Sequence, residues 1–141
     1  MAKKILLSVC IVIVLIAGYN IYDNNRIIVS KQNIKIFNLP EKFDGFTILQ
    51  ISDLHGKRFG KKQKHLLEKI NNCKYDVIVI TGDMLATGSS DVGPFFEMIE
   101  GIKNKTQMFY TSGNTGPWGY NGYIGQTNEM GRKLEEKGLS L

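Results

Sequence analysis

The sequence is poor in cysteine, contains no internal repeat and has no low-complexity tract. Its two cysteines, Cys10 and Cys73, cannot build a disulfide framework, so they do not indicate the redox compartment of the protein. The lack of repeats excludes a repeat architecture. Its basic residues are accompanied neither by a recognition motif nor by a pattern of stacking aromatic residues, so we expect no binding to nucleic acid.

A long apolar run lies near the N-terminus, over residues 5–22 (ILLSVCIVIVLIAGYNIY). About 18 residues of helix span about 27 Å, which is close to the thickness of the apolar part of a bilayer. A cleaved signal peptide is the alternative, but its apolar core usually has ~7–15 residues and precedes an Ala-x-Ala-like site. Ala17-Gly18-Tyr19 matches such a site poorly. We therefore expect residues 1–23 to form an uncleaved signal anchor of a single-pass protein of the cell membrane.

The charges around this run predict its orientation. Lys3 and Lys4 flank its N-terminal side, and positively charged flanks stay on the cytoplasmic side of a membrane. The rest of the chain, residues 24–141, is then expected on the extracytoplasmic side. Arg26 weakens this prediction because it places one positive charge on the expected outer side.

Beyond the anchor, strand-like apolar runs alternate with helical patterns. The expected strands are 46–51, 77–81 and 108–112. The expected helices are 61–73, 94–102 and 129–137. Gly138 should end the last helix as a C-terminal cap, and residues 139–141 resemble the opening of another strand. Strands that alternate with helices favour an α/β fold with a largely parallel sheet.

An additional hairpin is expected between the anchor and the first of these strands. Residues 26–37 contain two pairs of alternating β-branched residues, separated by the turn-like sequence Ser-Lys-Gln-Asn at residues 30–33.

Polar side chains follow the three expected strands at the points where the strands end. Asp53 and His55 follow the first strand, Asp83 follows the second and Asn114 follows the third. Ligands of open α/β sheets bind at the carboxyl ends of the strands, and Asp, His and Asn side chains can hold divalent cations. Taken singly, each of these residues is also common in turns, so the metal site is predicted from the set.

The ordered motifs Asp53-x-His55, Gly82-Asp83 and Gly113-Asn114 resemble the calcineurin-like metallophosphoesterase superfamily, in particular its bacterial membrane-anchored phosphodiesterase branch. The resemblance implies two divalent metal ions (Mn, Fe, Zn or similar). Asp53 and His55 would bind one ion, Asp83 would bridge both, and Asn114 would bind the second. It also implies the N-terminal half of a four-layer α/β/β/α sandwich, so that residues 24–141 would be a partial family domain.

The function implied by this resemblance is hydrolysis of phosphate esters by a phosphodiesterase or pyrophosphohydrolase, with lipid-linked or nucleotide-sugar substrates. The sequence departs from the family at Thr115, where the third motif normally continues with a histidine that assists the transition state. Further histidine ligands belong to the family's C-terminal half, whereas this sequence has only His55 and His65. We therefore assign no catalytic residue, and Asp53, His55, Asp83 and Asn114 are predicted as metal ligands. The alternative function is that of a truncated, inactive, membrane-tethered remnant.

The expected partners follow from the same reasoning. They are the membrane bilayer, a phosphoester substrate and a downstream half-domain polypeptide with the missing histidine motifs. Basic residues cluster just after the first motif, and they either form a solvated helix face or attract anionic substrates or lipid head groups. They are Lys57, Arg58, Lys61, Lys62 and Lys64.

Overall fold

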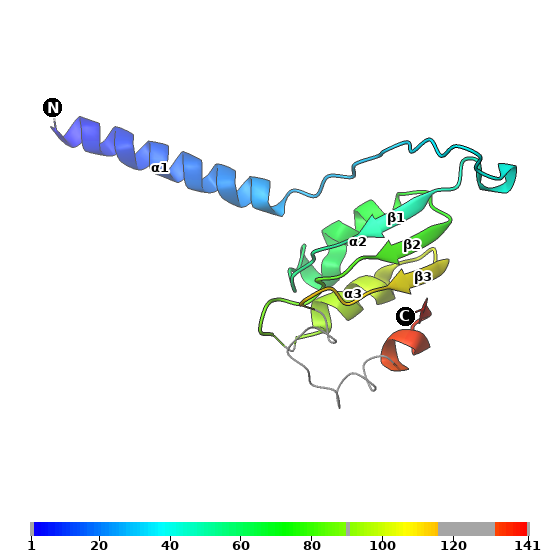
Figure 1. Ribbon diagram of the computed structural model, residues 1–141. Coiled ribbons are helices and arrows are strands. Elements are labelled where there is room, and N and C mark those ends of the chain that lie inside the picture. Colours follow the sequence, from blue (N-terminus) through cyan, green and yellow to red (C-terminus); the bar gives the residue numbers. More distant parts are fainter. Residues whose placement is uncertain (1, 90, 116–131, 141) are drawn as a thin grey trace. The chain divides into compact units, whose positions relative to one another are not determined.

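The computed structural model describes residues 2–89, 91–115 and 132–140 and divides the chain into two compact units, Met1–Lys31 and Gln32–Leu141. Helix α1, Ala2–Asn25, makes up most of the first unit (Figure 1). It is long and apolar enough to cross a membrane, a property that it shares with signal sequences.

Two polar side chains in the apolar run of α1 have hydrogen-bond partners within the helix itself. The amide of Asn20 donates to the Ile16 carbonyl at 2.9 Å, and the hydroxyl of Ser8 donates to the Lys4 carbonyl at 3.1 Å. A polar group without a partner is costly in hydrocarbon. These contacts within the helix reduce that cost.

The second unit is built on a parallel four-stranded sheet, as the sequence predicts. Its strands, in spatial order, are β1 (Ile48–Ile51), β2 (Val77–Ile80), β3 (Gln107–Tyr110) and β4 (Leu139–Ser140). Ile51 lies beside Ile80, which in turn lies beside Tyr110. Strands β1, β2 and β3 thus end level with one another, so the three loops that follow them leave the same edge of the sheet.

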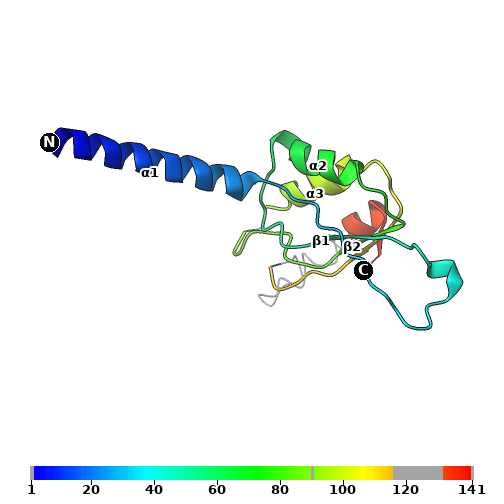
Figure 2. The same ribbon diagram turned by 90° about the horizontal axis from the view of Figure 1, so that it is seen from above.

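Helices α2 (Lys64–Asn71) and α3 (Gly93–Gly101) lie on the same side of the sheet (Figure 2). The side chains of Ile70, Phe95 and Met98 are buried between these helices and the strands. Alternation along the strands sends the inner side chains into this core. They are Leu49, Ile51, Ile78, Ile80, Met108, Tyr110 and Leu139.

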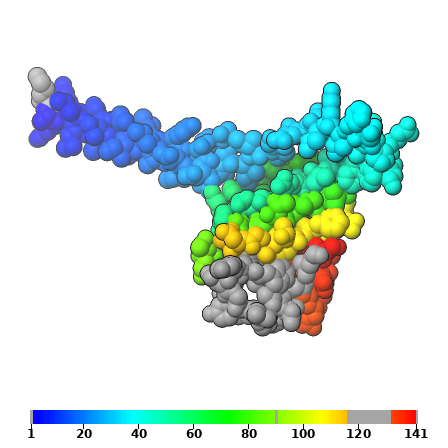
Figure 3. Space-filling view, in the orientation of Figure 1, coloured from blue at the N-terminus to red at the C-terminus, as the bar shows by residue number. Residues whose placement is uncertain are grey.

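The opposite face of the sheet is partly open. The side chain of Ile48 on β1 is 58% exposed and that of Phe109 on β3 is 41% exposed. Figure 3 shows the strands at the surface, coloured from blue-green to yellow. Parallel sheets are normally covered on both faces. The described residues supply a helical layer for one face and leave apolar side chains exposed on the other.

The predicted hairpin over residues 26–37 is wrong. These residues form neither strand nor helix, and the next regular element is the 3₁₀ turn Glu41–Phe43. Ile34 is 78% exposed and Phe37 is 92% exposed. Isolated two-stranded hairpins are marginal without an apolar surface to pack on. Alternation alone therefore did not produce strands here.

The predicted helix over residues 61–73 begins with the short 3₁₀ segment Lys61–Gln63 and becomes α-helical at Lys64. Gln63 is fully buried. Its side-chain oxygen, Oε1, accepts from the Phe59 N–H at 2.9 Å, and its side-chain nitrogen, Nε2, donates to the Pro94 carbonyl at 3.1 Å. This side chain ties the segment after the first motif to the start of α3.

The last predicted helix, 129–137, begins outside the described residues, and residues 132–136 are helical as expected. Gly138 has φ 87°, and its N–H donates to the Glu135 carbonyl at 2.8 Å. This is the left-handed helix ending that the sequence predicts. Residue 141, the last of the predicted strand opening, also lies outside the described residues.

Candidate metal centre

Backbone hydrogen bonds continue beyond the sheet and align the three loops that follow β1, β2 and β3. The N–H of Asp53 donates to the Gly82 carbonyl at 3.1 Å, and that of His55 donates to the Asp83 carbonyl at 2.9 Å. The N–H of Asp83 donates in turn to the Ser112 carbonyl at 3.1 Å. The first loop is thus fixed beside the second, and the second beside the third.

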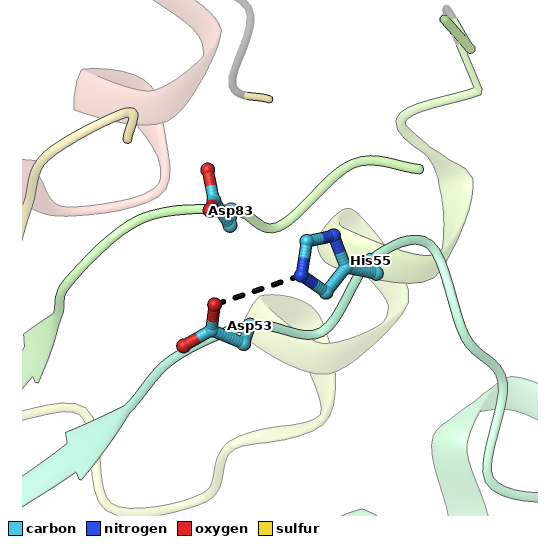
Figure 4. Close-up of side chains that lie close together, drawn as sticks. All are labelled: Asp53, His55 and Asp83. Carbon is cyan, nitrogen blue, oxygen red and sulfur yellow. Dashed lines mark ion pairs between the residues drawn. The ribbon is translucent and has the colours of Figure 1, made fainter. Parts of the chain in front are cut away.

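This alignment brings three of the predicted ligands together. One ligand atom from each of Asp53, His55 and Asp83 lies within 4.8 Å of the others. His55 Nε2 is 3.6 Å from Asp53 Oδ1 (Figure 4). Leu54, between the two, is only 6% exposed, whereas Asp53 and His55 are exposed. Both polar side chains are therefore accessible at the surface.

The backbone at these ligands is strained. Asp53, His55 and Asp83 have φ values of 56°, 48° and 54°, in the left-handed region that few residues other than glycine adopt. Such strain costs about 1–3 kcal/mol per residue and is concentrated at functional sites. Asn38, Lys62 and Gln63 also have positive φ, so what distinguishes the cluster is that all three of its donors adopt this conformation.

Asp83 is held by the third loop. Its Oδ1 accepts from the backbone N–H groups of Asn114 and Thr115, both at 2.8 Å, and from the Thr115 hydroxyl at 3.1 Å. The hydrogen bond from the Thr115 N–H is the largest cause that lowers the pKa of the Asp83 carboxyl below its ordinary value. The carboxylate is therefore ionised at neutral pH, as a metal ligand must be.

Asn114, the fourth predicted ligand, reaches this cluster through its backbone. Its N–H donates to Asp83 Oδ1 at 2.8 Å, and its side chain is exposed. The contact between Thr115 and Asp83 was not predicted from the sequence. Proximity to a predicted ligand was the only available signal, because the sequence does not show where the Thr115 hydroxyl points.

Two glycines allow the second and third loops to touch. A Cβ atom on Gly82, whose φ is 104°, would lie 2.7 Å from the Gly113 Cα. A Cβ atom on Gly113, whose φ is 66°, would clash with Oδ1 of Asp83 and would lie 2.6 Å from its backbone nitrogen. Glycine is required at both positions because there is no space for a side chain.

Gly113→Ala is expected to weaken Mn²⁺ binding by ~10-fold or more. The added methyl group displaces the side chain of Asp83, and loss of the contacts that orient a metal ligand typically weakens metal binding to this extent. The control is Gly45→Ala: Gly45 has φ 75° but nothing within 4 Å of an added Cβ. Titration of Mn²⁺ into the full chain in detergent measures the affinity of each variant, and urea unfolding shows whether each variant is folded. Equal Mn²⁺ affinity in the two variants would contradict the proposed contact.

The donor set fits a divalent cation. Two carboxylates and one imidazole suit Mn²⁺, Fe²⁺ or Zn²⁺, which accept oxygen and nitrogen ligands. Asp53 Oδ2 accepts from the Ser52 hydroxyl at 2.5 Å, so each carboxylate is anchored through one oxygen. A zinc-like ion takes about four ligands. The cluster of Asp53, His55 and Asp83 offers three of these ligands, and even with the predicted ligand Asn114 the set is too small for two ions.

The comparison with protein families agrees with this geometry. A family model of calcineurin-like phosphoesterases matches residues 46–137, a range that contains the four predicted ligands and strands β1, β2 and β3. No curated protein and no solved structure gave a significant match. The chain belongs to the calcineurin-like phosphoesterases, a family of metal-dependent hydrolases of phosphate esters.

Proposed function

We propose that the protein is part of a membrane-anchored phosphoester hydrolase with two divalent ions. Asp53 and His55 would hold one ion, Asp83 would be shared by both and Asn114 would hold the second. The observation that carries the proposal is the cluster of Asp53, His55 and Asp83, whose ligand atoms lie within 4.8 Å of one another. It lies at the carboxyl edge of a parallel sheet, where such folds bind their ligands.

When bound, divalent ions would supply Lewis-acid stabilisation of the phosphoryl oxygens and a water molecule of lowered pKa. The contribution of the chain is to fix the donors in advance. Asp83 is ionised and is held by three hydrogen bonds. His55 and Asp53 lie on a loop whose backbone is bonded to the neighbouring loop. Donors fixed in this way need little rearrangement when the metal and the substrate bind.

The proposed substrates are phosphodiesters or pyrophosphates of lipid-linked or nucleotide-sugar type. Helix α1 supports this proposal, because residues 1–23 as an uncleaved anchor would keep the domain of residues 24–141 close to lipid-linked substrates. The flank of Lys3 and Lys4 supports an extracytoplasmic domain.

The topology can be tested with a tag at the C-terminus of the full chain. In spheroplasts, we expect added protease to remove the tag, and we expect the N-terminal sequence of the membrane-bound protein to remain intact. The intact N-terminus follows from the absence of a convincing cleavage site. A protected tag would reverse the proposed orientation, whereas a mature N-terminus near Tyr19 would rule out the anchor.

A second polypeptide segment with histidine ligands is proposed to complete the centre. The four predicted ligands are too few for two ions, and in the described part of the chain the apolar face with Ile48 and Phe109 is exposed, which offers a surface for such a segment. The test is co-expression with a segment that carries the family's histidine motifs. We expect Mn²⁺-dependent hydrolysis of bis-p-nitrophenyl phosphate and of a nucleotide sugar. Activity that persists in Asp83→Asn would contradict the proposed centre.

An inactive, membrane-tethered relative of these enzymes is the second candidate function. The observation that favours it is Thr115, which stands where the family has a histidine and whose hydroxyl is bonded to Asp83. A threonine hydroxyl neither carries a positive charge nor donates a proton with a useful pKa. Failure of the completing segment to restore hydrolysis, with Mn²⁺ still bound, would favour this candidate.

A further inference from the structure

Both carboxylates of the cluster are anchored through one oxygen by a neighbouring hydroxyl. Oδ2 of Asp53 accepts from the Ser52 hydroxyl at 2.5 Å, and its Oδ1 lies 3.6 Å from the imidazole of His55. For Asp83, the hydrogen bonds from the described residues all go to Oδ1. Among the described residues, these hydrogen bonds thus engage one oxygen of each carboxylate, Oδ2 of Asp53 and Oδ1 of Asp83.

The donors to Asp83 differ in how firmly the fold fixes them. Two are backbone N–H groups of residues 114 and 115, which belong to the loop itself. The third is the hydroxyl of Thr115. Because threonine is β-branched, its χ1 angle has few accessible rotamers, and this side chain is half-buried. A hydroxyl held in this way resists rotation of the carboxylate, and hydrogen bonds to ionised acceptors are about twice as strong as neutral ones.

We propose that Thr115 is a positioning residue of the metal centre. Its hydroxyl keeps Oδ1 of Asp83 engaged with the protein, so that Oδ2 is the oxygen presented to the cation. This inference rests on the proposed role of Asp83 as a metal ligand. It gives Thr115 a function different from that of the histidine found at this position in the family: Thr115 acts on the metal through Asp83 and does not contact the substrate.

The test compares Mn²⁺ binding by the full chain in detergent, purified without a histidine tag, with that of two variants. Free Mn²⁺ is measured by its EPR signal. Thr115→Val keeps the shape of the side chain and removes the hydroxyl, whereas Thr115→Ser keeps the hydroxyl. We expect Thr115→Val to raise the Kd about 10–100-fold, the usual loss when a partner of a metal ligand is removed. Thr115→Ser should bind nearly as tightly as the wild type.

Urea unfolding without metal shows whether the variants fold alike, and Thr115→Ala replaces Thr115→Val in the comparison if the latter does not fold. Wild-type affinity in Thr115→Val would overturn the positioning role and leave the proposed metal centre intact. Equal weakening in Thr115→Ser and Thr115→Val would also overturn it, because the hydroxyl would then not be responsible. Absence of Mn²⁺ binding in the wild type would overturn both the inference and the proposed function.

Discussion

Asp83→Ala is expected to weaken Mn²⁺ binding by ~100-fold or more. The variant removes a proposed ligand itself, whereas loss of a ligand's supporting partner alone typically costs 10–100-fold. Asp83 is also the residue on which the loops converge: its carbonyl accepts from the His55 N–H, and its carboxylate accepts from Asn114 and Thr115. Titration of Mn²⁺ into the full chain, followed by the EPR signal of the free ion, measures the loss.

Asp44→Ala is the matched control, because Asp44 is an exposed carboxylate after the 3₁₀ turn at residues 41–43. Its affinity for Mn²⁺ should equal that of the wild type. Wild-type affinity in Asp83→Ala would remove Asp83 from the site. A similar loss in both would indicate general electrostatic attraction of the cation in place of a defined centre.

The second large effect concerns hydrolysis. On its own, the chain is expected to show no turnover of bis-p-nitrophenyl phosphate with Mn²⁺ above background. A group that donates a proton or stabilises charge typically contributes about 10²–10⁴-fold, and Thr115 cannot replace the family histidine in that role. The four predicted ligands are also too few for two ions. This turnover is compared with that of the same chain after addition of a segment that carries the family's histidine motifs.

Robust turnover by the full chain alone, abolished in Asp83→Ala, would contradict this expectation. It would show that the described ligands suffice for catalysis and that no second segment is needed. Solubility should be measured in parallel, since the exposed apolar face that contains Ile48 and Phe109 favours association between copies.

The sheet and the approximate position of the site were predictable because both depend on local patterns. Apolar runs predicted β1, β2 and β3, and the polar residues after them predicted the ligand cluster. Errors at the strand boundaries arose from specific contacts. The strand predicted to begin at residue 46 begins at Ile48. Just before it, the N–H of Thr47 donates to the side chain of Asp76 at 2.7 Å and is not paired with a neighbouring strand.

The backbone of the site was not predictable. The segment from Ser52 to His55 contains no glycine, yet Asp53 and His55 are left-handed, as is Asp83. Hydrogen bonds between loops impose this conformation, since the N–H groups of Asp53 and His55 both donate to carbonyls of the β2 loop. Such contacts join residues about 30 positions apart and depend on the assembled sheet, so tertiary structure overrides local preference. The contact of Thr115 with Asp83 was not predictable for the same reason, because it also joins two loops that meet only in the assembled sheet.

The most direct test of the central claim is pulsed EPR of Mn²⁺ bound to the full chain, purified without a histidine tag. The sequence contains two histidines, of which only His55 belongs to the cluster. We expect the ¹⁴N coupling of one coordinated imidazole, which is lost in His55→Gln and retained in His65→Gln. A coupling that persists in His55→Gln, or one that disappears in His65→Gln, would contradict the assignment of this cluster as the metal centre.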